Sequence, residues 1–249
     1  MYSNSSEDRE KVEKRLKETQ KVFGYVFDRT TLLNIYKLFT SKVLDRFEFP
    51  IASGKESIVF AASSGGKFYA VKIYKTVAST FKNIERYAGQ RWDVNTSGNR
   101  RKFIGKWAYQ EFRNLRIASD AGVLVPKPVK VSGSILVMQY LGTKRRPSTL
   151  LKDYEVDEKI MKECINSIRK LYLDAGMVHG DLSEYNFLIF RRRPYMIDMA
   201  QAVSTRDEVA SFLLKRDVRI IAKFFNKIGF ELQENKLLKY ITGEKDVFY

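Results

Sequence analysis

The chain has 249 residues, 44% of them hydrophobic, with 17 Phe and 14 Tyr, a composition that can form a buried core and that excludes a disordered protein. No apolar run approaches the roughly 20 residues of a membrane-spanning helix, and the first twenty residues lack the apolar segment of a secretory signal peptide. Lysine and arginine outnumber aspartate and glutamate by 45 to 29, a formal net charge of +16, which favours an anionic partner without specifying a fold.

The first half of the chain alternates helical and strand patterns. We expect helices over residues 1–48, because "TLLNIYKLF" places apolar residues at helical spacing, and then two strands, "SIVFAA" and "KFYAVKIY", joined by the turn "SSGG". Residues 76–105 are polar and aperiodic, so we expect a long mobile loop. Apolar spacings of three and four predict a helix from Trp107 to Ala121, which ends at Gly122.

The second half begins with a strand, "SILVMQYL", and a linker between two lobes, "GTKRRPST". A helix is predicted from Val156 to Ala175. It contains Cys164, the only cysteine, which cannot form an internal disulfide and therefore indicates a buried residue of a cytoplasmic protein. Further helices are expected around residues 207–228.

The segment "MVHGDLSEYNFLIFRRRPYMIDMAQ" brackets a predicted hairpin with polar side chains. "FLIF" and "YMI" are short strands and "RRRP" connects them. Asn186 precedes the first strand and Asp198 follows the second, so the hairpin brings an amide oxygen and a carboxylate together. Such ligands suit Mg²⁺. Asp181, five residues before Asn186, is expected to face the same metal-bound phosphate.

The hairpin "SIVFAA"/"KFYAVKIY" predicts the other half of a nucleotide site. If "SSGG" closes the turn, Ala62 pairs with Lys67, and Lys72 lies opposite Ser57 beside the loop "ASGKES". Strand alternation places Val59 and Ala70 on the face that carries Lys72, where small side chains can cover a flat base. A glutamate is expected to hold the lysine, with Glu111 favoured over Glu85.

The order of these motifs resembles the protein kinase signature. More specifically, "ASGKESIVF", "VKIY", "HGDLSEYN" and "IDMAQAV" are similar to the motifs of the RIO family of atypical kinases, in particular its first subgroup, which lacks a winged-helix domain. The resemblance covers about Phe27 to Gly229. It implies an α+β, two-lobed kinase-like fold with one RIO kinase-like domain over residues 1–249, divided into N-terminal helices over 1–48, an N-lobe over 49–141 and a C-lobe over 142–249.

The resemblance also implies roles for individual residues. Lys72 would contact the ATP α and β phosphates and pair with Glu111, and Asp181 would orient the acceptor hydroxyl and take its proton. Asn186 and Asp198 would hold Mg²⁺, with Mn²⁺ as an alternative, and Asp198 is also a candidate phosphate acceptor. The remaining nucleotide contacts would come from Ser53, Gly54, Lys55, Glu56, Val59, Ala70, Met138 and Tyr140.

Three functions are open on the sequence. The first is an ATP- and Mg²⁺-dependent serine/threonine protein kinase that also phosphorylates itself, with Ser79, Thr96 and Ser97 as candidate acceptors. The second is an ATPase switch in maturation of the small ribosomal subunit, with ribosomal RNA or a subunit precursor as partner. The third is a small-molecule phosphotransferase, which also carries an "HGD" loop. A Walker nucleotide motif is excluded, and no membrane partner is expected.

Several features keep two interpretations each. His179 is expected to orient the loop around Asp181, not to catalyse. Asp217 either braces the catalytic loop or forms a surface ion pair. The basic clusters "RRKF" at 100, "KRR" at 144 and "RRR" at 191 are either solvated loop tips or an RNA-facing surface.

Overall fold

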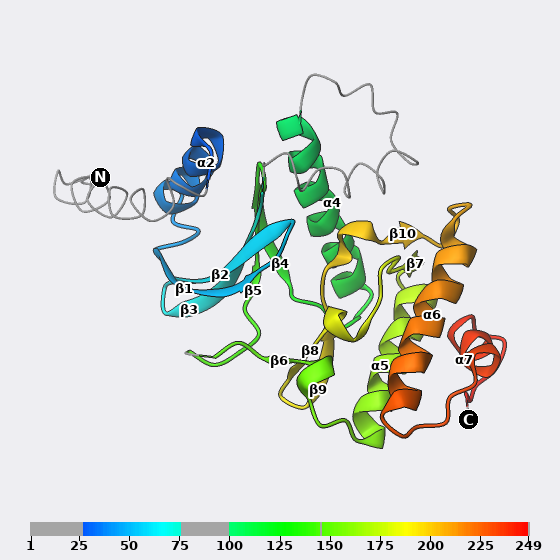
Figure 1. The fold of residues 1–249 in the computed structure, drawn as a ribbon. Coiled ribbons are helices and arrows are strands. Elements are labelled where there is room, and N and C mark those ends of the chain that lie inside the picture. Colours follow the sequence, from blue (N-terminus) through cyan, green and yellow to red (C-terminus); the bar gives the residue numbers. More distant parts are fainter. Residues whose placement is uncertain (1–26, 76–99, 145, 249) are drawn as a thin grey trace, which may run out of the picture. The chain divides into compact units, whose positions relative to one another are not determined.

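The computed structural model describes residues 27–75, 100–144 and 146–248. The chain divides into two compact units, and each is described by itself (Figure 1). The first unit contains residues 1–108 and 130–137, and the second contains residues 109–129 and 138–249. Residues 1–26 of the predicted helical region over 1–48 and most of the predicted loop over 76–105 lie outside the described residues.

A five-stranded sheet organises the first unit, in the order β1-β2-β3-β5-β4. Its strands are β1 (Arg46–Ser53), β2 (Ser57–Ser64), β3 (Lys67–Tyr74), β4 (Pro128–Ser132) and β5 (Ile135–Gln139). The predicted helical region over 1–48 is therefore wrong for residues 46–48, because Phe47 and Phe49 alternate with polar residues as in an edge strand. Pro50 fits such a strand, since an edge leaves one row of N–H groups unused.

The turn between β2 and β3 corrects the predicted register. Gly65 and Gly66 both have positive φ, 55° and 76°, which allows a tight turn between Ser64 and Lys67. The two serines of "SSGG" therefore extend β2. Lys72 lies opposite Val59 and not opposite Ser57, a shift of two residues that keeps every side chain on its predicted face.

One face of this sheet is apolar. Helix α2 (Arg29–Thr40) begins at Asp28, whose carboxylate accepts a hydrogen bond from the Thr31 N–H. The helix contributes Ile35 and Leu38 to a core cluster with the sheet residues Ala62, Val71, Ile73, Ile135 and Val137. The alternation of the strands places Val59, Ala70 and Lys72 on the other face, as predicted.

Helix α4 (Arg100–Asp120) begins earlier than the sequence pattern indicated. The predicted loop over 76–105 is wrong for residues 100–105. Phe103, Ile104 and Trp107 are all buried, so the apolar stripe of the helix starts before Trp107. The sequence pattern misses this start because "RRKF" is mostly charged, although an amphipathic helix can contain charged residues.

The second unit is mostly helical. Helices α5 (Glu158–Leu173) and α6 (Ala210–Lys227) confirm the helices predicted in these regions, and α7 (Glu234–Ile241), which was not predicted, packs against both. Cys164 is fully buried, as expected. Along the described parts of the chain, no helix combines the length and apolar character needed to cross a bilayer.

Two small sheets complete the second unit. One has the order β6-β8-β9, from β6 (Thr149–Leu150), β8 (Phe187–Phe190) and β9 (Arg193–Met196), and the other pairs β7 (Met177–Val178) with β10 (Val203–Ser204). Short 3₁₀ turns, η1 (Leu151–Asp153), η2 (Glu184–Asn186) and η3 (Met199–Gln201), connect them.

The predicted β8–β9 hairpin is confirmed, with a shorter turn. Phe190 pairs with Arg193, so the turn consists of Arg191 and Arg192, while Arg193 and Pro194 belong to β9. At the open end, the Ile197 N–H donates to the Asn186 carbonyl over 2.8 Å. This hydrogen bond brings the residue before Asp198 against Asn186.

Candidate active site

The catalytic-loop candidate lies between β7 and β8 in the second unit and contains Asp181. About half of the Asp181 side chain is exposed. Its Oδ2 atom accepts a hydrogen bond from Gln201 Nε2 over 3.2 Å, and its Oδ1 atom lies 4.0 Å from a terminal nitrogen of Arg216. A carboxylate in this position is oriented by neighbours and still reachable by a substrate.

Asp217 braces the backbone on both sides of Asp181. Its side chain is 2% exposed, and it accepts hydrogen bonds from the N–H groups of Gly180 at 2.8 Å and Leu182 at 3.2 Å. Arg216 donates to the Gly180 carbonyl. These hydrogen bonds agree with the bracing interpretation of Asp217. Asp217 also lies 3.5 Å from a terminal nitrogen of Arg216, so it forms an ion pair as well, although its own carboxylate is buried.

Gly180 is required by the shape of this loop. Its φ is +80°, and a Cβ atom there would lie 2.8 Å from the Gln201 carbonyl oxygen. Any other residue would be strained by its backbone conformation and would also collide with backbone. The close approach of residues 180 and 201 sets the position of Asp181 relative to the loop after β9.

Asn186 and Asp198 lie at the open end of the β8–β9 hairpin. Asn186 is buried, and its Oδ1 atom accepts a hydrogen bond from the Ser183 hydroxyl over 2.7 Å, which leaves a second lone pair on the amide oxygen. Asp198 adopts a left-handed backbone conformation with φ of 67°, which aspartate tolerates better than most residues.

This donor set suits a hard divalent cation that is completed by other ligands. Within the described ranges, no group of three or more His, Cys, Asp or Glu side chains is arranged as a protein-only metal cage. Mg²⁺ is usually bound by one or two protein oxygens together with water and substrate phosphates. Asn186 and Asp198 are compatible with that pattern.

His179 joins the catalytic loop to the hairpin. Its side chain is buried, and Nε2 lies 2.9 Å from the Ile197 carbonyl oxygen. A carbonyl only accepts hydrogen bonds, so the imidazole proton is on Nε2. Nδ1 is buried and has no hydrogen-bond partner among the described residues. This contact agrees with the predicted orienting role of His179.

The surroundings of Asp181 raise the pKa of its carboxyl group above the ordinary value for aspartate. Burial is the main cause that raises the pKa of Asp181, and the carboxylates of Asp198 and Asp217 raise it further, while His179 and Arg216 act in the opposite direction. Burial also raises the pKa of Asp217, against the effects of His179, its two backbone hydrogen bonds and Arg216.

The loop after Asp198 is held by a residue that the sequence analysis did not select. Asn114, buried on α4, donates through Nδ2 to the carbonyls of Met199 at 2.8 Å and Ala202 at 3.2 Å. An amide at a buried position of an amphipathic helix is the signal that would have identified it. Gln201 and Arg216 were also missed, because exposed-looking polar residues carry no pattern.

Lys72 occupies the face of the first unit's sheet opposite α2. The residue is 6% exposed, and its Nζ atom lies 5.1 Å from the centroid of the Tyr74 ring. The register sets Val59 directly across from Lys72 and Ala61 across from Ala70. The Tyr74 ring therefore supplies a cation–π contact to the Lys72 ammonium, on the sheet face that also carries Val59, Ala61 and Ala70.

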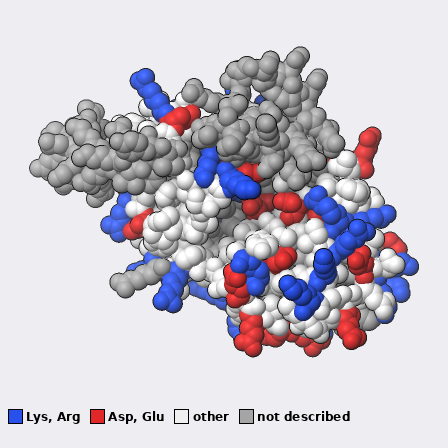
Figure 2. Space-filling model, viewed as in Figure 1, with Lys and Arg blue, Asp and Glu red and all other residues white. Residues whose placement is uncertain are grey.

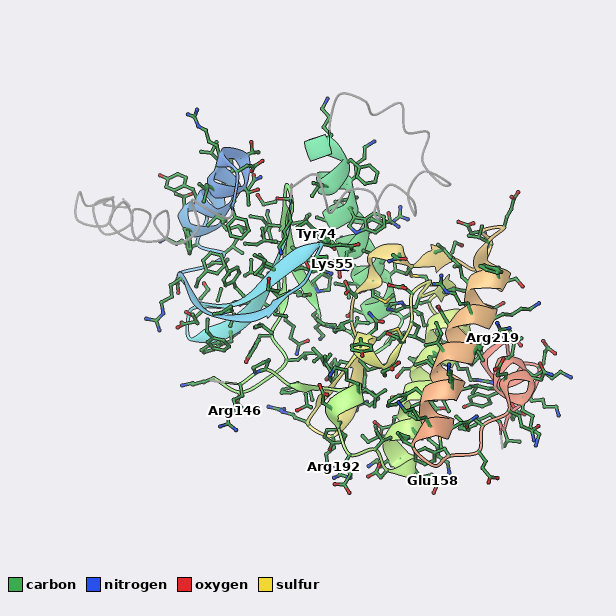
Figure 3. The ribbon with its side chains drawn as sticks, viewed as in Figure 1. Lys55, Tyr74, Arg146, Glu158, Arg192 and Arg219 are labelled. Carbon is green, nitrogen blue, oxygen red and sulfur yellow. The ribbon has the colours of Figure 1, made fainter. Side chains whose placement is uncertain are left out.

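The loop over Ser53, Gly54, Lys55 and Glu56 connects β1 and β2. The Gly54 N–H donates to the Ser57 carbonyl at 2.9 Å, and Lys75 contacts the loop twice, through its N–H to Glu56 at 2.8 Å and through Nζ to the Gly54 carbonyl at 2.6 Å. Lys55 is exposed at this loop, and Tyr74 lies at the end of β3 (Figure 3).

The remaining predicted residues belong to the second unit. Met138 and Tyr140 are buried at and just after the end of β5, and Glu111 is buried on α4. Lys72 and Glu111 lie in different units, so their pairing stays a prediction. The competitor Glu85 and the candidate acceptors Ser79, Thr96 and Ser97 lie outside the described residues.

Comparison with solved structures assigns the fold. The chain matches the crystal structure of the Rio2 kinase from Chaetomium thermophilum with a TM-score of 0.70 at 21% identity, over 86% of this chain and 67% of that one. It matches the Rio2 kinase–ADP/Mg²⁺–phosphoaspartate complex from the same organism with a TM-score of 0.66 at 21% identity, over 85% of this chain and 66% of that one. It spans about two thirds of these solved chains. The fold is thus α+β and protein-kinase-like, as predicted.

Sequence comparison assigns the family. The RIO domain model matches residues 58–237. The chain is 37% identical to the RIO-type serine/threonine-protein kinase Rio1 of Methanocaldococcus jannaschii, over 94% of this chain and 81% of that protein. It is 40% identical to the RIO-type serine/threonine-protein kinase Rio1 of Thermoplasma acidophilum, over 74% of this chain and 98% of that protein. The chain belongs to the RIO family.

Proposed function

We propose that this protein is an ATP- and Mg²⁺-dependent serine/threonine protein kinase of the first RIO subgroup, with a single kinase domain over residues 1–249. The observation that carries the proposal is the arrangement of Asp181, Asn186 and Asp198 in the second unit. Asp217 accepts hydrogen bonds from the backbone on both sides of Asp181, Ser183 donates to Asn186, and Asn114 donates to the carbonyl of Met199, next to Asp198. Relatives named Rio1 serine/threonine kinases, 37% and 40% identical, support it. The family match favours it over a small-molecule phosphotransferase.

In the second unit, Asp181 would orient the acceptor hydroxyl and accept its proton as the oxygen attacks the γ-phosphorus, the bond to the bridging oxygen breaks and ADP leaves. Asn186 and Asp198 would hold Mg²⁺, which neutralises phosphate charge when bound, and Mn²⁺ would be accepted by the same oxygen ligands. Phosphoryl transfer requires little covalent help from protein, so the rate depends chiefly on positioning and electrostatics. The brace from Asp217 serves the positioning.

In the first unit, Lys72 would contact the α and β phosphates, and Val59 and Ala70 would cover the base. Burial of Lys72 supports this role, because a desolvated ammonium interacts strongly with phosphate. Glu111 would pair with the lysine. The loop residues Ser53, Gly54, Lys55 and Glu56 would contact phosphates, and the backbone of Met138 and Tyr140 would contact adenine.

A second candidate function is an ATPase switch that acts in assembly of the small ribosomal subunit. The Rio2 kinase of C. thermophilum was crystallised with ADP, Mg²⁺ and a phosphoaspartate, and Asp198 is the corresponding candidate in this chain. Its carboxylate would attack the γ-phosphorus and release ADP, and water would then hydrolyse the acyl phosphate to free phosphate. The formal charge of +16 supports a ribosomal RNA or subunit-precursor partner. The single, buried cysteine supports a cytoplasmic location.

The test is incubation with γ-labelled ATP and Mg²⁺ while label is followed on protein and as free phosphate. We expect acid-stable phosphoserine or phosphothreonine, reduced about 10²- to 10⁴-fold in Asp181→Asn, since a general base contributes a factor of that order. Asp198→Ala should lose the response to Mg²⁺. Alkali-labile protein label with release of free phosphate would instead establish the ATPase switch, and no turnover in the wild type would refute both.

A further inference from the structure

Two basic segments that are far apart in sequence meet at one end of the β6-β8-β9 sheet. The pairing of Thr149 with Ile189 is antiparallel, so the chain before Thr149 and the chain after Ile189 leave the sheet at the same end. Five exposed cations gather there: Lys144, Arg146, Arg191, Arg192 and Arg193. Arg146 and Arg192 both point outward from their loops in Figure 3. We call these five residues the hairpin-end surface.

The loop before β6 is a small hairpin of its own. The Thr143 N–H donates to the Arg146 carbonyl at 2.9 Å, Gly142 bridges to Pro147, and the Ser148 N–H donates to the Leu141 carbonyl at 2.9 Å. These backbone groups are satisfied within the loop. Lys144 and Arg146 are both exposed in this loop.

The turn between β8 and β9 uses residues that its backbone disfavours. Arg191 and Arg192 have φ of 52° and 57°, and two-residue turns of this kind normally contain Asn-Gly or Asp-Gly. Arginine in the left-handed conformation costs free energy. Observed backbone strain of this kind is associated with function, and here the strained residues present two adjacent guanidinium groups to solvent.

Aromatic rings and an exposed ion pair lie beside these arginines. The Arg191 guanidinium lies 5.1 Å from the centroid of the half-buried Phe190 ring, and Phe190 packs edge-on against Tyr195. Asp157 pairs with Arg192 at 2.7 Å, but both side chains are substantially exposed. An exposed pair contributes little and exchanges readily for a phosphate.

We propose that the hairpin-end surface binds the phosphate backbone of single-stranded RNA. Guanidinium groups recognise phosphate with paired hydrogen bonds, and nearby rings can stack with unpaired bases. RNA is favoured over an acidic protein because every nucleotide carries a charge, whereas a protein segment would need an unusual density of acidic residues to match cations on two loops. The inference rests on the proposed association with RNA and specifies the surface that binds it. It does not depend on phosphoryl transfer.

The decisive variant is Arg191→Asn/Arg192→Gly, which installs the preferred turn sequence. We expect Tm to rise by about 2 to 4 °C, the shift that relief of modest strain produces in a chain of this size, while affinity for a fluorescent single-stranded RNA falls at least about tenfold. The slope of log K against log salt should decrease by about 0.7 for each lost phosphate contact. A variant that is more stable yet binds RNA less cannot be explained by misfolding.

The matched control is Lys215→Ala/Lys223→Ala, which removes the same charge from the exposed face of α6, where Figure 2 also shows lysine and arginine side chains. It should retain most of the RNA affinity. Equal loss of affinity in the control and in Arg191→Asn/Arg192→Gly would show diffuse binding to positive charge and overturn the proposal. Unchanged affinity in Arg191→Asn/Arg192→Gly would also overturn it.

Two further experiments distinguish a failure of this inference from a failure of the proposed function. Asp181→Asn should bind RNA with the affinity of the wild type. RNA binding can therefore be established even if the protein proves not to be a kinase. Polyglutamate of matched charge should compete poorly with RNA for the wild type. If it competes equally well, the surface recognises acidic protein and the RNA proposal is wrong.

Discussion

The catalytic loop of the second unit and the β1–β2 loop of the first unit are stabilised in different ways. The catalytic loop is held by buried side chains, with Asp217 bonded to two of its N–H groups and His179 bonded across to Ile197. The β1–β2 loop is held by its own backbone and by Lys75. The comparison indicates that the backbone around Asp181, the proposed proton acceptor, is held by buried side chains, whereas the candidate phosphate loop is held mainly by backbone hydrogen bonds.

The strongest test of this contrast is Asp217→Ala. It would leave the N–H groups of Gly180 and Leu182 without their buried acceptor, so we expect the free energy of unfolding to fall by about 1 to 3 kcal/mol and phosphoryl transfer to fall with it. Denaturant unfolding and single-turnover kinetics measure the two effects. Asp174→Ala, which removes an exposed partner of Lys170, should change stability by no more than about 0.5 kcal/mol. Comparable losses in both variants would contradict the brace.

A pair of glycine substitutions separates backbone conformation from close packing. Gly180→Ala combines a φ of +80° with an approach of 2.8 Å to the Gln201 carbonyl, whereas Gly66 has a φ of +76° and open space around it. Both variants should lose about 1 kcal/mol of stability to the left-handed conformation. Only Gly180→Ala should lose more and also lower the turnover number. Equal effects would mean that the contact between residues 180 and 201 is unimportant.

The pH dependence tests the charges around Asp181. Because the pKa of Asp181 is raised, the acid limb of the pH–rate profile should lie above the pH at which an ordinary aspartate titrates. Arg216→Gln removes a positive charge that lowers this pKa, so the acid limb should move to higher pH. Arg219→Gln, an exposed change one turn away that removes the contact with Glu234, should leave the limb in place. An opposite shift in Arg216→Gln would show that Asp181 is not the titrating base.

The smallest expected effect is at the β1–β2 loop. Lys55 is exposed, so Lys55→Ala should change the free energy of unfolding by less than about 0.5 kcal/mol. If the loop contacts phosphates, KM for ATP should rise a few-fold with little change in kcat, since a flexible exposed contact adds mainly to binding. A large decrease in kcat with unchanged KM would show that this loop is as preorganised as the catalytic loop.

The local patterns of the sequence were sufficient for the β8–β9 hairpin and for helices α5 and α6. The hairpin ends place Asn186 and Asp198 together because strand pairing acts over a few residues. The face of β3 that carries Lys72 also follows from strand alternation alone, and a register error of two residues left it unchanged.

The three-dimensional structure decided one local detail, the length of a turn, and two features whose energy comes from distant partners. The turn at Gly65 and Gly66 set the register of β2 and β3, because "SSGG" allows more than one turn length and the backbone selects the one in which both glycines take positive φ. The early start of α4 depends on burial of Phe103 and Ile104. Asn114 became part of the site because carbonyls 85 and 88 residues further along the chain needed a donor, and no local pattern encodes such a pairing.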